Sequence, residues 1–155
     1  MDALAKKLGR RLKAAGEKLV TAESCTGGWV AQAVTSVAGS SDWFERGFVT
    51  YSNASKQELL GVKGKTLKIH GAVSEQTARA MAQGALARSR GTLALAVTGV
   101  AGPGGGTAAK PVGMVCFAWA RKGKVGSETR RFSGGRESVR RKSVVYALQG
   151  VLNIL

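Results

Sequence analysis

The sequence predicts an α/β fold, a three-layer α/β/α sandwich around a mixed, mostly parallel sheet. Short apolar segments alternate along the chain with segments whose apolar residues recur at helical spacing. Several of the short segments are apolar throughout, which is typical of strands buried on both faces by helices. With 155 residues, no internal repeat and no long linker, residues 1–155 are expected to form a single domain.

Apolar spacing and capping residues predict the elements of the first half. Leu4, Leu8 and Leu12 recur at helical spacing among basic residues and indicate an amphipathic helix. Asn53 suits an N-cap, where its side chain would accept a backbone N–H. In order, the predicted elements are a helix over 3–15, a strand over 19–22, a helix from Trp29 to Gly39, a strand over 47–51 and a helix that begins at Asn53.

The same signals predict the elements of the second half. Residues 61–72 mix three glycines with three lysines and are expected to form a solvated connection. Ser74 is a suitable cap for the helix that follows it. The remaining predicted elements are that helix as far as Arg90, a strand over 93–97, a glycine-rich loop over 98–107, a strand over 114–120, a turn over 122–124, a strand over 125–132 and a helix over 136–152.

The last predicted helix carries two adjacent apolar stripes, one that includes Val139 and Val151 and one that includes Val144 and Leu148. Burial of both stripes inside the fold is the favoured interpretation. Contact with a second copy in a homo-oligomer is the alternative.

Composition excludes several classes of protein. Cys25 and Cys116 are the only cysteines, too few and too far apart for a disulfide framework or a zinc pattern, so a reducing cytoplasmic location is expected. The apolar stretches are shorter than the ~18 residues of a membrane span, and the N-terminus lacks the apolar core of a signal peptide. His70 is the only histidine, and no close cluster of metal ligands is visible, so neither a metal nor a cofactor is expected.

The net charge of +15 would ordinarily suggest a polyanionic partner. The excess is heaviest in residues 111–155, which hold nine basic and two acidic residues. Aromatic residues number only nine, and Trp29, Trp43 and Phe44 occupy positions typical of packed side chains rather than of a stacking platform for bases. Nucleic acid is therefore an unlikely partner.

The segment from Glu23 to Gly28 lies where a predicted strand turns into a helix. This geometry exposes a side chain beside free helix N-terminal N–H groups, which can stabilise an oxyanion. Ser24 is a candidate nucleophile there. Capping of the helix by Ser24 or Thr26 is the alternative, although it does not explain the glycines. Cys25 could compete as nucleophile but is more typical of a small packing residue.

A serine nucleophile needs a base, and a neutral lysine is the nearest chemical option without a histidine partner. Lys56 would lie in the first turn of its helix, where the macrodipole disfavours its charge. Tyr51, at the end of the preceding strand, could donate to Ser24 or relay its proton. Spacing alone also fits a solvated Lys56 and a Tyr51 that serves only as a strand residue.

The 98–107 loop concentrates glycines, which allow backbone N–H groups to converge on an anion. It lacks the spacing of a P-loop and of a dinucleotide-binding loop. Arg136 and Arg140, four residues apart in the last helix, could share one face and clamp a phosphate. A flexible surface loop and a solvated basic face are the alternatives.

Five segments, in order along nearly the whole chain, together resemble one known family. They are Thr21–Gly28, Gly47–Asn53 with Lys56, Gly71–Glu75, Thr98–Gly105 and Lys110–Gly113. The chain resembles the CinA carboxy-terminal domain family, whose stand-alone members are nicotinamide mononucleotide amidohydrolases of the PncC type. Thr98 stands where a serine is common in the family, and the hydroxyl is kept.

The resemblance implies a three-layer α/β/α fold and an amidase in which Ser24 is the nucleophile, Lys56 the general base and Tyr51 their assistant. It also implies that the glycine loop binds the nucleotide and that a pyridine mononucleotide is the partner. Together with the residue chemistry, it gives the expected substrate-binding set of Cys25, Thr26, Gly27, Gly28, Thr98, Gly99, Ala101, Gly102, Gly104, Gly105, Arg136 and Arg140. A nucleic-acid-binding or competence-related accessory role and a different physiological amide are the alternatives.

Overall fold

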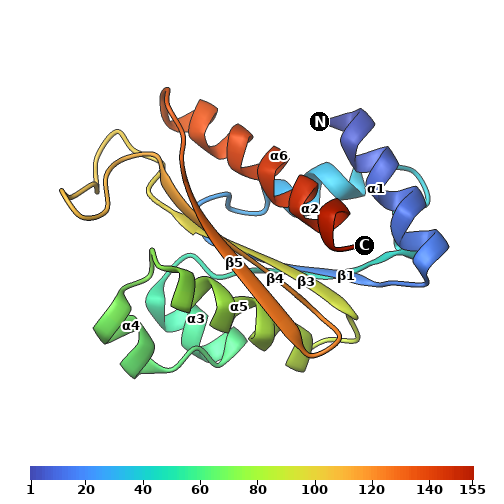
Figure 1. Cartoon of the computed structure of the whole chain (residues 1–155), viewed down its shortest axis with the longest axis horizontal. Helices are drawn as coiled ribbons and strands as arrows, with labels where there is room; N and C mark the ends of the chain where they lie inside the picture. Colours follow the sequence, from blue (N-terminus) through green and yellow to red (C-terminus); the bar gives the residue numbers. More distant parts are fainter.

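The computed structural model describes residues 1–155 as one five-stranded sheet with helices on both faces (Figure 1). The strands are β1 (Leu19–Glu23), β2 (Phe44–Val49), β3 (Leu93–Gly99), β4 (Met114–Arg121) and β5 (Lys124–Arg131), in the spatial order β2-β1-β3-β4-β5. β1 pairs in parallel with both β2 and β3, whereas β4 pairs antiparallel with both β3 and β5. Only β4 runs against the others, so the prediction of a mixed, mostly parallel sheet is confirmed.

The helices form the two outer layers of the sandwich. They are α1 (Asp2–Ala15), α2 (Trp29–Thr35), α3 (Asn53–Leu60), α4 (Gly64–His70), α5 (Glu75–Ala87) and α6 (Arg136–Ile154), with a short 3-10 turn at Ser40–Asp42. Helices α1, α2 and α6 cover one face of the sheet, and α3, α4 and α5 cover the other (Figure 1). None of these helices has both the length and the apolar character that a membrane crossing requires.

β3 shows why some strands are apolar throughout. Leu95 and Val97 face the core beneath α1, α2 and α6, whereas Ala94 and Ala96 face the core beneath α3 to α5. A strand buried on both faces has no position for a polar residue, because successive side chains point to opposite sides. Both stripes of α6 are also buried within the chain, so the favoured interpretation of that helix is confirmed.

Two helices of one layer, α3 and α5, approach each other closely. On α5, Gly84 packs directly against the backbone of Leu60 at the end of α3, and a Cβ at Gly84 would lie only 2.9 Å from the Leu60 carbonyl carbon. A glycine in a helix interior costs about 1 kcal/mol relative to alanine. This close approach explains why a glycine stands in the middle of α5.

Two local predictions need correction. Residues 61–72 are not only a solvated connection, because α4 forms within them and buries Leu67 against the α5 side of the sheet. Asn53 is the first residue of α3 rather than its cap, and Ser52 accepts the hydrogen bond from Ser55 N at 3.0 Å. The predicted Ser74 cap of α5 is confirmed, since its side chain accepts from Thr77 N.

Candidate active site

A pocket of about 180 Å³ opens at the edge of the sheet where the three parallel strands end. β1 lies between β2 and β3, so the chain leaves the ends of these strands in different directions and creates a crevice there. Ten residues line the pocket: Ser24, Cys25, Tyr51, Lys56, Ala72, Val73, Thr98, Gly99, Ala101 and Arg136. The structure thus brings the three predicted catalytic residues to one place.

Ser24 follows β1 directly and is held by the sheet. Its backbone N–H donates to Val97 O of β3 at 2.9 Å, and its carbonyl accepts from Gly27 N at 3.0 Å. The side chain is largely buried, and its hydroxyl oxygen lies 2.9 Å from Lys56 Nζ. The only side chain that contacts this hydroxyl through a hydrogen bond is therefore a potential base.

Lys56 is buried almost completely, with 1% of its surface exposed. Besides Ser24 Oγ, its Nζ reaches the carbonyl oxygens of Thr50 at 2.8 Å and Tyr51 at 3.1 Å. No carboxylate contacts it, so no negative charge offsets the loss of water around a charged ammonium. Burial therefore lowers the pKa of Lys56 from its usual 10.5.

Tyr51 contributes differently from the prediction that its hydroxyl would serve Ser24. Its carbonyl accepts from Lys56 Nζ. The residue is 63% exposed, and its hydroxyl accepts from Arg136 Nη2 at 3.4 Å. No hydrogen bond joins the hydroxyl to Ser24. The side chain forms a wall at the mouth of the pocket together with Arg136.

The loop after Ser24 supplies backbone rather than a second nucleophile. Burial raises the pKa of the Cys25 thiol to about 12, so this thiol is poorly suited to act as a nucleophile. Gly27 and Gly28 adopt φ angles of 60° and 99°, which glycine tolerates best. The N–H groups of Cys25 and Thr26 donate to no protein acceptor and stay available for an oxyanion.

The alternative in which Ser24 or Thr26 caps the helix is wrong. The first turn of α2 is capped instead by Glu23, whose carboxyl group accepts from Val30 N at 2.8 Å and from Ala31 N at 3.0 Å. Thr26 Oγ1 also donates to Glu23, at 2.7 Å. Glu23 is not among the residues predicted to have a role, although acidic residues are favoured beside helix N-termini and this one precedes the predicted nucleophile.

The glycine-rich loop projects beyond the end of the sheet (Figure 1). Its first part belongs to the pocket: Gly99 and Ala101 line it, and Thr98 Oγ1 donates to Ala72 O at 2.8 Å in the opposite wall. Gly104 and Gly105 are exposed and do not line it. The N–H groups of Ala101, Gly102, Gly104 and Gly105 donate to no protein acceptor.

The two arginines predicted to clamp a phosphate are separated. Arg136 lines the pocket and donates to Gly102 O at 2.8 Å. Arg140, one turn further along α6, does not line it. Its Nε donates to Cys25 O and its Nη2 to Thr26 O, both at 3.0 Å, and its guanidinium lies over the ring of Trp29.

The model of the CinA C-terminal domain matches residues 1–155. The chain belongs to this family.

Two family members named nicotinamide-nucleotide amidohydrolase PncC are similar to it over most of their length. The protein from Escherichia coli strain K12 is 53% identical over 147 residues, which cover 94% of this chain and 89% of that one. The protein from Pseudomonas putida is 52% identical over 151 residues, covering 97% and 94%. Among solved structures of the family, the competence/damage inducible protein CihA from Agrobacterium tumefaciens aligns with a TM-score of 0.96 and 48% identity over 99% of this chain and 94% of that one.

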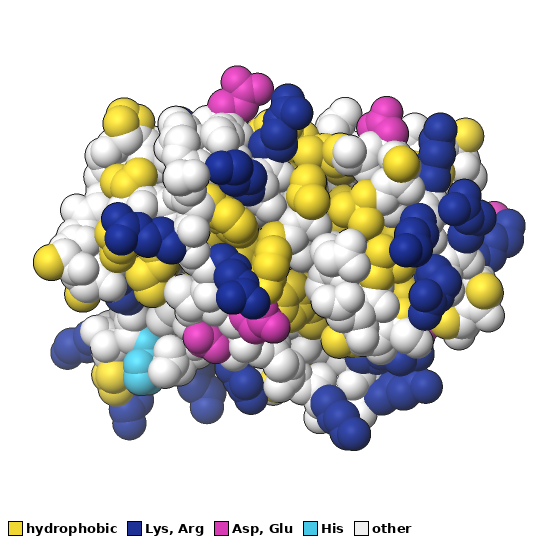
Figure 2. All heavy atoms as spheres, turned by 45° about the horizontal axis from the view of Figure 1, so that its top comes forward, with side chains coloured by type: hydrophobic (Ala, Val, Ile, Leu, Met, Phe, Trp, Pro, Cys, Tyr) yellow, Lys and Arg dark blue, Asp and Glu magenta, His cyan; other side chains and the backbone are white.

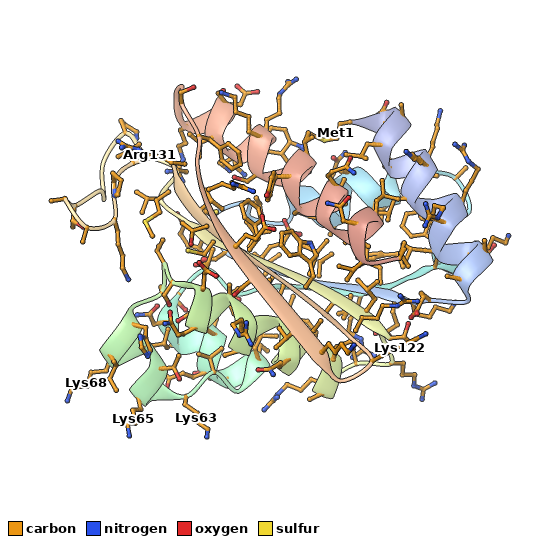
Figure 3. The ribbon with its side chains drawn as sticks, viewed as in Figure 1. Met1, Lys63, Lys65, Lys68, Lys122 and Arg131 are labelled. Carbon is orange, nitrogen blue, oxygen red and sulfur yellow. The ribbon has the colours of Figure 1, made fainter.

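A second, larger pocket of about 630 Å³ lies outside this site and is lined by residues that include His70, Glu75, Lys110 and Cys116. No group of three or more His, Cys, Asp or Glu side chains is placed to hold a metal ion. His70 is exposed at the end of α4 and does not line the pocket that holds Ser24 and Lys56. Basic side chains are spread over the face in Figure 2, and Lys63, Lys65 and Lys68 point away from the body of the domain in Figure 3.

Proposed function

We propose that the chain hydrolyses the carboxamide of nicotinamide mononucleotide to nicotinate mononucleotide and ammonia, a step of pyridine nucleotide recycling. The observation that carries this proposal is the contact between Ser24 Oγ and a buried Lys56 that has no acidic partner. The names of the relatives from E. coli and P. putida support the choice of substrate. Two free, buried cysteines are compatible with work in the reducing cytoplasm.

The environment of Lys56 suits a neutral amine acting as a base. A neutral amine has two N–H groups and one lone pair. The carbonyls of Thr50 and Tyr51 take both N–H groups, which leaves the lone pair for the hydroxyl proton of Ser24. A bound pyridinium ring would add a positive charge nearby and favour the neutral amine further.

The reaction then proceeds through an acyl-enzyme. Ser24 Oγ attacks the carboxamide carbon while its proton moves to Lys56, and the resulting oxyanion faces the N–H groups of Cys25 and Thr26. Lys56 returns the proton to the amide nitrogen, the C–N bond breaks, and ammonia leaves. Water next attacks the ester carbon, Lys56 accepts a proton from it, and Ser24 departs with that proton as nicotinate mononucleotide is released.

The mouth of the pocket offers a place for the phosphate. Arg136 lies there beside free N–H groups of the glycine-rich loop and is hydrogen-bonded to the Tyr51 hydroxyl. Guanidinium and convergent backbone N–H groups are both suited to a phosphate. Arg140 is given no part in this step because it does not line the pocket and two of its five N–H groups are held by the Cys25 and Thr26 carbonyls.

An ammonia-release assay tests the proposal. The wild-type protein should release ammonia from nicotinamide mononucleotide, and from the riboside more slowly because the riboside lacks the phosphate. Ser24→Ala and Lys56→Met should each reduce the rate by at least about 10³-fold. Lys63→Met, which removes an exposed lysine, is the matched control and should stay at the wild-type rate. Full activity of Ser24→Ala would refute the proposal.

A further inference from the structure

Two charged side chains of opposite sign hold the loop after Ser24 from its two sides. Glu23 is completely buried and accepts hydrogen bonds from Thr26 Oγ1 and from two N–H groups in the first turn of α2. Arg140 reaches the same loop from α6 and donates to the carbonyls of Cys25 and Thr26. The proposed reaction gives neither side chain a step of its own.

The contact of Arg140 determines the direction of one peptide unit. The Cys25 carbonyl and the Thr26 N–H belong to the same planar trans peptide, so they point in opposite directions. Because the Cys25 carbonyl is drawn to Arg140 Nε at 3.0 Å, the Thr26 N–H points away from α6. That N–H has no protein acceptor. Donation from a guanidinium to the carbonyl also polarises the peptide and strengthens its N–H as a donor.

Glu23 fixes the same residue through its side chain. Its carboxyl group binds the Thr26 hydroxyl and the start of α2 together, so the position of Thr26 relative to the helix is set. With its side chain held by Glu23 and its carbonyl held by Arg140, Thr26 has little freedom to rotate. Preorganised donors of this kind need no rearrangement during reaction.

We propose that Glu23 and Arg140 are positioning residues that orient the Thr26 peptide, so that its N–H acts as a donor of the oxyanion hole beside Ser24. This inference rests on the proposed serine mechanism but not on the identity of the substrate. Arg140 acts through the loop without touching substrate. Its guanidinium faces two carbonyls and the ring of Trp29, and none of these contacts depends on a bound ligand.

The first test measures catalysis in matched variants of α6. Arg140→Met removes both hydrogen bonds and keeps an apolar stem over Trp29, whereas Arg141→Met removes the same charge from an exposed neighbour. Arg140→Met should lower kcat for nicotinamide mononucleotide by about 10- to 100-fold with KM changed by less than about threefold, and Arg140→Lys should restore part of it. Arg141→Met should match the wild type. Equal kcat in the two methionine variants would overturn the inference.

A second readout separates positioning from a loss of folded protein. With the thioamide analogue of the substrate, sulfur fits an oxygen-sized hole poorly, so the wild type should prefer the amide strongly. Arg140→Met and Glu23→Gln should reduce this preference, because the donor is displaced. A variant that is merely less folded would slow both substrates equally, and that result would overturn the inference.

A third readout keeps this inference distinguishable from the proposed function. Phenylmethanesulfonyl fluoride transfers its sulfonyl group to a reactive serine: the Oγ–S bond forms, fluoride leaves, and the serine proton passes to the base. Mass spectrometry should find Ser24 labelled in the wild type and about 10-fold more slowly in Arg140→Met. Slower labelling of Arg140→Met than of the wild type, without ammonia release by either protein, would refute the substrate assignment and support the inference. No difference between Arg140→Met and Arg141→Met would refute the inference alone.

Discussion

Replacing Gly84 with alanine should destabilise the domain, although alanine is the better helix former. A Cβ at Gly84 would lie 2.9 Å from the carbonyl carbon of Leu60 and 3.1 Å from its Cβ. The obstacle is the backbone of α3, which cannot move away by a rotamer change, so α3 would have to shift by roughly 1 Å. Overpacking of this kind costs about 3 kcal/mol, and the helix propensity of alanine returns about 1 kcal/mol. The net loss of about 2 kcal/mol should lower Tm by ~4–8 °C.

The same shift should reduce activity, because Lys56 lies one turn before Leu60 on α3. Its Nζ would leave the position 2.9 Å from Ser24 Oγ, and a misplacement of about 1 Å can cost ~100-fold in rate. Thermal unfolding followed by circular dichroism gives Tm, and ammonia release gives kcat. Gly126→Ala is the control, since a Cβ there meets nothing within 4 Å. An unchanged or higher Tm for Gly84→Ala would refute the packing argument.

Three further predictions concern titration. The rate of hydrolysis should rise with pH through the lowered pKa of Lys56 and level off below pH 10.5. A pH profile of kcat/KM that is flat from acid to alkaline pH would contradict a lysine base. The second prediction concerns stability. Because burial lowers the pKa of Lys56, the folded protein binds fewer protons than the unfolded chain between that pKa and 10.5, so the free energy of unfolding should rise with pH through this window. Urea titrations of Lys56→Met should show a smaller rise. Cys25 should resist iodoacetamide at pH 9.0 in the native protein, because burial raises the pKa of its thiol to about 12, and should react once urea unfolds the chain. Detection of labelled Cys25 in the native protein by mass spectrometry would disprove this.

Local chemistry made Ser24 and Lys56 predictable as a pair. A chain with a single histidine outside any motif leaves few bases, and a lysine just inside a helix N-terminus is one of them. The contact itself depends on β1 and β2 being parallel neighbours, since only then do the residues after both strands meet at one edge. The carbonyl partners of Lys56 lie five and six residues before it, between β2 and α3, but backbone carbonyls have no signal in the sequence.

The sequence predicts the helix face on which Arg136 and Arg140 lie but not the partner of each side chain. Four-residue spacing places Arg136 and Arg140 on one face of a helix, and this is correct. It does not determine what each side chain meets, because α6 crosses the site at an angle that only packing sets. One arginine therefore reaches the glycine-rich loop and the other reaches the loop after Ser24.

The α4 segment illustrates a different limit. Its lysines and glycines are typical of a solvated connection, and its seven residues bury a single side chain, Leu67. One apolar contact is too little periodicity to indicate a helix from sequence. The role of Glu23 was not predicted, because its contacts with Val30 N and Ala31 N require α2 to fold back over the end of β1, although an acidic residue beside a helix N-terminus is a known signal.

The reach of Arg140 across the chain has a consequence for biosynthesis. The guanidinium that holds the Cys25 carbonyl is separated from it by 115 positions, so the loop after Ser24 is made long before its support. While the chain grows from its N-terminus, the serine and its lysine can meet before α6 has left the ribosome. The peptide that would stabilise negative charge is oriented only when α6 docks. Under the proposed mechanism, an emerging chain would hold its nucleophile before its oxyanion hole, and full activity would follow only when α6 docks.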